Sequence, residues 1–379
     1  MPLINLPTFA PDLLADFASL QTERVDTPVI QPAEPFLDMA GEDLRRRIFM
    51  TESETGQSLC LRPEFTIPVC LRHIETATGT PRRYAYLGEV FRQRREGGNE
   101  FYQAGIEDLG ERDVARADAR AVHDALFVLG HRLPGRTLKV VLGDQAMFEA
   151  VVAACGLPRG WQKRLIHAFG NQDRLRDLLE ALSQPISTGV FGPEVERLAT
   201  LGLLNDEAAL SRHIDETMQA TGYSTNASRT PADIARRLRE KMDLASVRLD
   251  VKTAATLRAF LAIEVPLNEA PAALFDFARH AGLAIDEALA RFDARAKALV
   301  DAGVDPAVIT YRSAFGRPLD YYTGLVFEVL ADGDPAVLAG GGRFDRLMTL
   351  LGATTHIPAV GFSLWLDRIE QAIAQGASA

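Results

Sequence analysis

The feature that most constrains the fold is a long helical segment placed between two groups of strands. Residues 46–110 contain short β-prone runs separated by turn residues, as in antiparallel strands. One helix and one strand follow over 113–143, and residues from about 145 to 305 have almost wholly helical periodicity. Strands return from about 307. We therefore expect a sheet that is discontinuous in sequence, with the helical segment inserted into it.

This order predicts the α+β class, with an antiparallel sheet core flanked by helices. We expect residues 1–150 and 306–379 to form the discontinuous core and residues 151–305 to form a helical insertion domain. The chain has 379 residues, of which 47% are hydrophobic and 24% charged. This length and composition suffice for two or three packed domains.

Composition disfavours several kinds of protein. No apolar run approaches the roughly 18 residues of a membrane span, and the N-terminus lacks the features of a signal peptide, so we expect a cytoplasmic protein without a membrane partner. The formal charge of −10 disfavours a broad nucleic-acid surface. Cys60, Cys70 and Cys155 show no CxxC spacing, so neither a disulfide framework nor a metal site is expected.

Polar residues stand among apolar ones in four segments, which together indicate a binding site. They are residues 61–66, 91–92 with 101–107, 317–324 and 340–345. We expect these polar groups to lie on strands. Because alternate residues of a strand share a face, Gln103, Gly105 and Glu107 point the same way and form a pocket floor. Each carboxylate taken singly is more often a solvated or ion-paired residue, so the hypothesis depends on their combination.

The predicted pocket suits a small zwitterion that carries an additional cationic or donor group, and histidine fits that description. The carboxylates are Glu64 and Glu107, the amide is Gln103 and the cation is Arg317. The glycine triplet at 340–342 predicts a turn, because phosphate binding would need a strand-to-helix context. We expect no cofactor.

These segments resemble the histidyl-tRNA synthetase family, of class II, over roughly residues 10–150 and 307–375. Pro28 is similar to the motif 1 proline and Arg92 to the motif 2 arginine, and residues 361–368 resemble motif 3 with its closing Arg368. The runs at 319–328 and 340–345 resemble the two peptides that distinguish the histidine enzyme within its class. The resemblance implies a class II synthetase-like core.

The resemblance also implies a role for each polar residue of the pocket. Glu64, Thr66 and Gln103 would hold the α-amino group of histidine, Glu107 and Tyr322 its imidazole, and Arg317 its carboxylate, with Tyr321 in the same site. Arg92 and Arg368 would be relics or would bind another anion. Such a pocket can select histidine without catalysing a reaction. Another amino acid would leave buried polar groups of the pocket unpaired, and each such group costs roughly 1–3 kcal/mol of binding free energy.

The chain departs from a synthetase where ATP and tRNA would bind. Trp365 stands where the family keeps glycine, and its spacing from Gly361 and Arg368 predicts one shared helical face. An indole buries on the order of 200 Å², enough to fill the volume that adenine needs. The alternative is an aromatic residue that only packs beside the sheet. Residues 369–379 leave no room for an anticodon-binding domain. The motif 2-like loop between Arg92 and Phe101 is short and lacks the second arginine that the family carries near its end, and Phe344 replaces the tyrosine usual in the GGRYD peptide.

This pattern is similar to that of the regulatory paralogues in the family, which are not enzymes themselves. They pair with the short-form catalytic subunit of ATP phosphoribosyltransferase, are required for its activity and bind L-histidine for feedback inhibition of the first step of histidine biosynthesis. The resemblance implies a homodimer around the strand near Pro28, within a hetero-oligomer and without tRNA. A truncated ligase that activates histidine with ATP, and a structural or RNA-binding module, remain alternatives.

Overall fold

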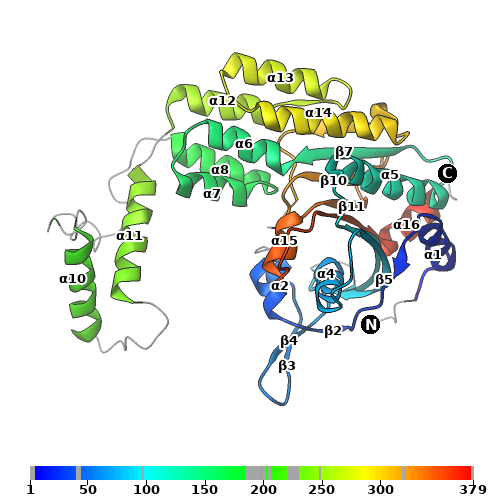
Figure 1. Cartoon of the computed structure of the whole chain (residues 1–379), viewed down its shortest axis with the longest axis horizontal. Helices are drawn as coiled ribbons and strands as arrows, with labels where there is room; N and C mark the ends of the chain where they lie inside the picture. Colours follow the sequence, from blue (N-terminus) through cyan, green and yellow to red (C-terminus); the bar gives the residue numbers. More distant parts are fainter. Residues whose placement is uncertain are drawn as a thin grey trace.

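The computed structural model describes residues 5–39, 44–94, 98–183, 198, 202, 206–220, 230–246, 249–317, 319 and 321–376. Figure 1 shows a strongly curved sheet beside a layer of helices. Fourteen helices of the described residues are α1 Ala10–Ser19, α2 Glu34–Met39, α4 Thr66–Glu75, α5 Val114–Arg132, α6 Gln145–Ala154, α7 Arg159–Ala168, α8 Gln172–Ser183, α10 Glu207–Ala220, α11 Pro231–Ser246, α12 Val251–Leu261, α13 Ala270–Ala281, α14 Asp286–Asp301, α15 Asp345–Leu350 and α16 Leu366–Gly376.

The main sheet has nine strands. In spatial order they are β1 Glu23–Arg24, β5 Arg82–Phe91, β6 Glu100–Leu109, β12 Ala359–Trp365, β11 Val337–Arg343, β10 Leu325–Ala331, β7 Leu138–Asp144, β9 Ile309–Arg312 and β8 Glu264–Pro266. The pairings from β5 to β7 are all antiparallel, whereas β1 pairs with β5 and β9 with β7 in parallel. The predicted α+β class, with strands from both ends of the chain in one sheet, is confirmed.

A smaller sheet holds part of the predicted strand region. It consists of β2 Ile30–Pro32, β4 Ser58–Leu61 and β3 Met50–Glu52, in that order. The interpretation of residues 46–110 as strands separated by turns is wrong for residues 66–75, which form α4 between β4 and β5. Pro63, just after β4, has no N–H to donate to a ladder, and the chain turns into the helix there. The predicted turn near Gly98 lies partly outside the described residues.

The two faces of the main sheet belong to different apolar clusters. On β6, Ala104 and Ile106 pack with α5 and α16, whereas Phe101 packs with α4 and α15 on the opposite side. This alternation follows from the two-residue period of a strand. The face that packs with α4 and α15, called the second face below, therefore carries Gln103 and Glu107 among apolar neighbours.

The C-terminal part of the segment 151–305 contacts the core. Its last helix, α14, contacts α5 and α6, and β8 pairs with β9 at the edge of the main sheet. In Figure 1, α10 and α11 instead lie far from the sheet. The division into a core of residues 1–150 with 306–379 and an insertion of residues 151–305 stays a prediction.

Candidate functional site

A pocket lies on the second face of the main sheet, under α4 and the loop that leads into β10. Its cavity volume is about 130 Å³. An apolar cavity of roughly 150 Å³ is large enough for benzene, so this pocket has room for a ligand with one small ring. The lining residues are Leu44, Arg47, Glu64, Thr66, Arg92, Gln103, Glu107, Arg317, Leu319, Tyr321, Tyr322, Gly340, Gly341, Phe344, Gly361, Phe362, Ser363 and Trp365.

The pocket floor is built from β6 and β12. Their antiparallel register pairs Gln103 with Trp365 and Glu107 with Gly361. Paired residues of an antiparallel ladder point to the same face, so all four belong to the pocket side. The predicted shared face of Gln103 and Glu107 is confirmed.

Glycines on β11 and β12 give the polar side chains their space. A β carbon at Gly340 would lie 2.5 Å from Arg317 Nη1, and one at Gly361 would lie 1.8 Å from Glu107 Oε2. The turn predicted at the glycine triplet is wrong, because residues 340–342 lie inside the continuous strand β11. Glycine serves here for close approach to neighbouring groups.

Glu64 and Thr66 reach the pocket from the start of α4, and not from a strand as predicted. The Thr66 and Ile67 backbone N–H groups donate to Glu64 Oε2 and Oε1 at 2.8 and 2.9 Å. The carboxylate thus satisfies two of the N–H groups that the first turn of a helix leaves unpaired. Burial raises the pKa of Glu64, against the opposing effect of these hydrogen bonds and of Arg92.

Glu107 is held at one oxygen and unpaired at the other. The Thr66 hydroxyl donates to Glu107 Oε1 at 2.7 Å. Glu107 Oε2 and Gln103 Oε1 are both buried and accept no hydrogen bond from the described residues. Burial raises the pKa of Glu107 well above its usual value, and the charge on Glu64 adds to the rise.

The loop before β10 supplies Arg317, Tyr321 and Tyr322. The strand predicted over this run begins only at Leu325, so the three side chains approach the pocket from a loop. Arg317 Nη1 donates to the Tyr322 phenol oxygen at 3.3 Å, and Arg317 Nε lies 3.5 Å from Glu328 Oε1. Burial raises the pKa of both tyrosines, which keeps the phenols protonated as donors.

Arg92 lies in the pocket, whereas Arg368 lies outside its lining. Arg92 Nε donates to the Pro63 carbonyl at 2.6 Å, and burial lowers the pKa of Arg92 to about 10. Arg368 Nη1 donates to the Val337 carbonyl at 2.8 Å, and its guanidinium lies 4.9 Å from the centre of the Trp365 ring. Of these two arginines, Arg92 is therefore part of the pocket, whereas Arg368 packs against the indole.

Trp365 both lines the pocket and packs in the core. The prediction that it shares a helical face with Gly361 is wrong, since both residues belong to β12, where alternate residues share a face. The indole is buried, and the Arg317 guanidinium lies 5.6 Å from its ring centre. The indole therefore both packs in the core and borders the cavity, and its exclusion of adenine stays a prediction.

Two polar lining residues, Arg47 and Ser363, were not predicted. Ser363 lies between Gly361 and Trp365 on the same face of β12, so strand alternation was a usable signal, and its hydroxyl is 2.7 Å from the Tyr86 phenol oxygen. Arg47 follows α2 in a segment without a recognisable motif. Within the described part of the chain, no three His, Cys, Asp or Glu residues gather in a way that could hold a metal ion.

The sheet order and the pocket define a class II synthetase-like core, and comparison with known proteins gives the family. The family model "Histidyl-tRNA synthetase" matches residues 12–369. A protein of Rhizobium meliloti named "ATP phosphoribosyltransferase regulatory subunit" is 74% identical over 376 residues, which is 99% of each chain. One of the same name from Sinorhizobium fredii is 73% identical over 379 residues, the whole of both chains. The chain belongs to the histidyl-tRNA synthetase family, among its members named ATP phosphoribosyltransferase regulatory subunits.

Solved structures show the same fold at low identity. An ATP phosphoribosyltransferase regulatory subunit/histidyl-tRNA synthetase from Bacillus halodurans superposes with a TM-score of 0.64 at 19% identity, over 98% of this chain and 82% of that one. Histidyl-tRNA synthetase from Nostoc superposes with a TM-score of 0.65 at 13% identity, over 100% of this chain and 77% of that one. The predicted family and class II-like fold are confirmed. Among the described helices, none has the length and apolar composition to cross a membrane.

Proposed function

We propose that this chain is a non-catalytic regulatory subunit that binds L-histidine in the pocket and controls a short-form ATP phosphoribosyltransferase catalytic subunit. The proposal extends the name of its relatives to this chain, at 66–74% identity over almost the whole length of the first eight relatives. In that role it is required for catalytic activity and reports the concentration of the pathway's end product.

The observation that carries the histidine site is the set of unpaired polar atoms around one ring-sized cavity. Among the described residues, Glu107 Oε2 and Gln103 Oε1 accept no hydrogen bond, and Arg317 Nε donates none, although it lies 3.5 Å from Glu328 Oε1 as an ion pair. Buried polar groups without partners cost free energy, so a ligand that supplies both donors and an acceptor is favoured. An amino acid with a carboxylate, an ammonium and ring N–H groups supplies them.

Each end of histidine has a matching set of residues. Glu64, Thr66 and Gln103 hold the α-amino group, Glu107 and Tyr322 the imidazole, and Arg317 the carboxylate, while Tyr321 closes the pocket. Tyr322 accepts from Arg317 through its oxygen, so the phenol hydrogen stays available for a ring nitrogen. The positive charge of Arg92 partly offsets the negative charge of Glu64 in the pocket.

Trp365 disfavours the alternative of a ligase that activates histidine with ATP. The indole ring centre lies 5.6 Å from the Arg317 guanidinium and 4.9 Å from that of Arg368, the motif 3-like arginine that such an enzyme would use at its nucleotide. A buried indole of on the order of 200 Å² leaves little room for adenine there. We therefore assign the retained arginines to ligand binding and packing, and not to nucleotide chemistry.

The partner is the catalytic subunit, joined to a homodimer of this chain. Val29 and Ile30, next to the motif 1-like Pro28, are exposed apolar residues, with exposed fractions of 37% and 56%. Neighbouring large apolar side chains at a surface favour an interface. Histidine regulates such an assembly only if it binds one of two states more tightly, with a coupling of typically 1–3 kcal/mol.

The test is phosphoribosyl-ATP formation by a short-form catalytic subunit from the same organism, with and without this chain, across a histidine titration. We expect the rate to rise when the chain is added and to fall with histidine. An unchanged rate would reject the regulatory role. Histidine-dependent exchange of pyrophosphate into ATP would then support the ligase, and failure of histidine to bind would favour a structural module.

A further inference from the structure

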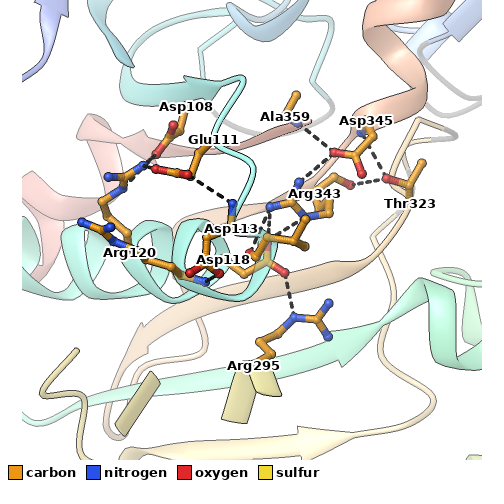
Figure 2. Close-up of polar contacts among 12 residues, drawn as sticks. Asp108, Glu111, Asp113, Asp118, Arg120, Arg295, Thr323, Arg343, Asp345 and Ala359 are labelled. Carbon is orange, nitrogen blue, oxygen red and sulfur yellow. Dashed lines mark hydrogen bonds and ion pairs between the residues drawn. The ribbon is translucent and has the colours of Figure 1, made fainter. Parts of the chain in front are cut away.

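Behind the pocket, on the opposite face of the sheet, lies a buried cluster of charged side chains. Asp118 of α5, Arg295 of α14 and Arg343 of β11 are at most 5% exposed. Asp118 Oδ1 lies 2.8 Å from Arg343 Nε, and Asp118 Oδ2 lies 2.7 Å from Arg295 Nε. Figure 2 shows Asp118 between the two guanidinium groups. One carboxylate thus joins two helices and a strand.

From Arg343 the contacts continue to the loop that carries the pocket residues. Arg343 Nη1 donates to Asp345 Oδ1 at 2.8 Å, and the Asp345 N–H donates to the Thr323 hydroxyl oxygen at 3.1 Å. The Thr323 N–H in turn donates to the Arg343 carbonyl at 2.8 Å. Figure 2 shows this step between Arg343, Asp345 and Thr323. Thr323 directly follows Tyr322, so its position sets where that phenol lies.

A second route connects α14 to the same loop. Arg295 Nη1 also pairs with Asp144 Oδ2, at the end of β7. The next residue, Gln145, donates its backbone N–H to the Gly324 carbonyl at 2.9 Å. Arg295 is therefore linked to the two adjacent residues, Thr323 and Gly324, that fix the end of the loop.

We infer that the cluster of Asp118, Arg295 and Arg343 positions the loop of Arg317, Tyr321 and Tyr322, and so sets ligand affinity and joins the pocket to α14. None of the three cluster residues lines the cavity, so they act through Thr323 and Gly324. A buried carboxylate shared by two guanidinium groups has a strongly preferred geometry, because a broken pair leaves an uncompensated buried charge. The inference rests on the proposed histidine site for its ligand.

The same helix α5 offers a matched control. Asp124 is as buried as Asp118 and also pairs with an arginine, Arg83 of β5, but no hydrogen bond or ion pair of the described residues connects it to the loop. Asp118→Asn and Asp124→Asn each remove one buried carboxylate charge from α5 with little change of volume. A purely structural role predicts similar effects of the two substitutions on stability and none on the pocket.

Two measurements on the full chain test the inference. Calorimetric titration with L-histidine should show about tenfold weaker binding for Asp118→Asn, within the range of coupling energies carried by packed networks, and less than twofold change for Asp124→Asn. Hydrogen exchange of the ligand-free chain should show faster exchange of the Thr323 amide in Asp118→Asn alone. Thr323→Val, which removes only the hydroxyl link, should weaken binding to a similar extent.

The outcomes separate the inference from the proposed function. Equal histidine affinity in Asp118→Asn, Asp124→Asn and the unchanged protein, or an unaltered Thr323 amide, would overturn the inference. Should Asp118→Asn not fold, Thr323→Val decides it: unchanged binding and exchange in that variant overturn the inference. Absence of histidine binding by the unchanged protein would reject the proposed ligand, while the exchange of Thr323 in the ligand-free chain still tests the positioning role.

Discussion

The Glu107 carboxylate occupies space that only a glycine at position 361 leaves open. A β carbon on Gly361 would lie 1.8 Å from Glu107 Oε2 and 2.7 Å from the Ile106 carbonyl oxygen. The two residues are direct partners in the ladder between β6 and β12. The position of the Glu107 carboxylate therefore requires glycine at position 361. A side chain at that position would push the carboxylate toward the cavity.

Gly361→Ala should destabilise the chain and weaken histidine binding together. Overpacking of a tight site costs about 1–3 kcal/mol, and the displaced carboxylate would enter the ligand volume. Urea unfolding and calorimetric titration with histidine measure the two effects. Gly130→Ala is the control, because Gly130 lies in α5 with no heavy atom within 4 Å of its β-carbon position. It should stabilise by up to about 1 kcal/mol and leave binding unchanged. Unaltered binding in Gly361→Ala would contradict the prediction.

The strands of the sheet, and the face that carries the polar residues, were predictable because strand periodicity is a local property of the sequence. The alternation of Gln103 and Glu107 with Ala104 and Ile106 placed both polar residues on one side, and the register confirms it. Family resemblance then added residues from distant segments, and the structure brings Glu64 and Arg317 to the same cavity as Gln103. Neither step needed knowledge of tertiary contacts.

The errors have one cause, since local patterns do not show what approaches a residue from elsewhere. A glycine triplet marks a turn when viewed alone, but Gly340 lies inside β11, where the approach of Arg317 leaves no room for a β carbon. Trp365 lies three residues before Arg368, which fits a helix, yet hydrogen bonding to β6 extends β12 through the tryptophan. The ion cluster around Asp118 was missed because both of its arginines lie more than 170 positions further along the chain.

Glu107→Ala should relieve histidine inhibition while leaving activation of the catalytic subunit nearly intact. Loss of a hydrogen bond to a charged group costs about 1.5–3 kcal/mol, which predicts a rise of roughly 10- to 150-fold in the histidine concentration for half inhibition. The activation at zero histidine serves as the internal control, and we expect it to change less than twofold. Equal loss of activation and inhibition would place the histidine site elsewhere.

Trp365→Ala should admit ATP to the volume from which we propose that the indole excludes adenine. Truncation of a buried tryptophan typically costs about 3–5 kcal/mol of stability and leaves a cavity. Trp161→Ala is the matched control, because Trp161 is also about 5% exposed and has Arg164 at 5.0 Å from its ring centre, but lies in α7. Titration with ATP should detect binding only in Trp365→Ala. Binding in neither variant, or in both, would count against the adenine-exclusion argument.

Ile30→Asp should convert the proposed homodimer to monomer. Ile30 is 56% exposed in β2, so a charge there costs little in an isolated chain but is desolvated in an interface. Sedimentation of the purified chain measures the change, and Leu350→Asp, at a 63% exposed residue of α15, is the control. A dimer that survives Ile30→Asp, or is lost equally in both variants, would move the interface away from β2.

The raised pKa of Glu107 predicts a stability difference that grows with pH. A carboxyl whose pKa is higher in the folded than in the unfolded chain contributes stability below its unfolded pKa of about 4.5, and that contribution is lost as pH rises through the folded pKa. Glu107→Gln removes the ionisation. The melting temperature of this variant, relative to that of the unchanged chain, should therefore rise from pH 5 to pH 8. Glu75→Gln, on the exposed end of α4, should show no such trend.

Saturating histidine should reduce the pH-dependent difference. A positively charged imidazole or ammonium beside Glu107 favours the ionised carboxylate and lowers its pKa towards the ordinary range. In the unchanged chain, histidine thus offsets the cost of burying the Glu107 charge. The glutamine variant carries no such charge, so histidine gives it no such gain in stability. Melting curves with and without histidine at pH 8 measure this effect, and a difference unaffected by histidine would mean that the ligand's charge does not lie at Glu107.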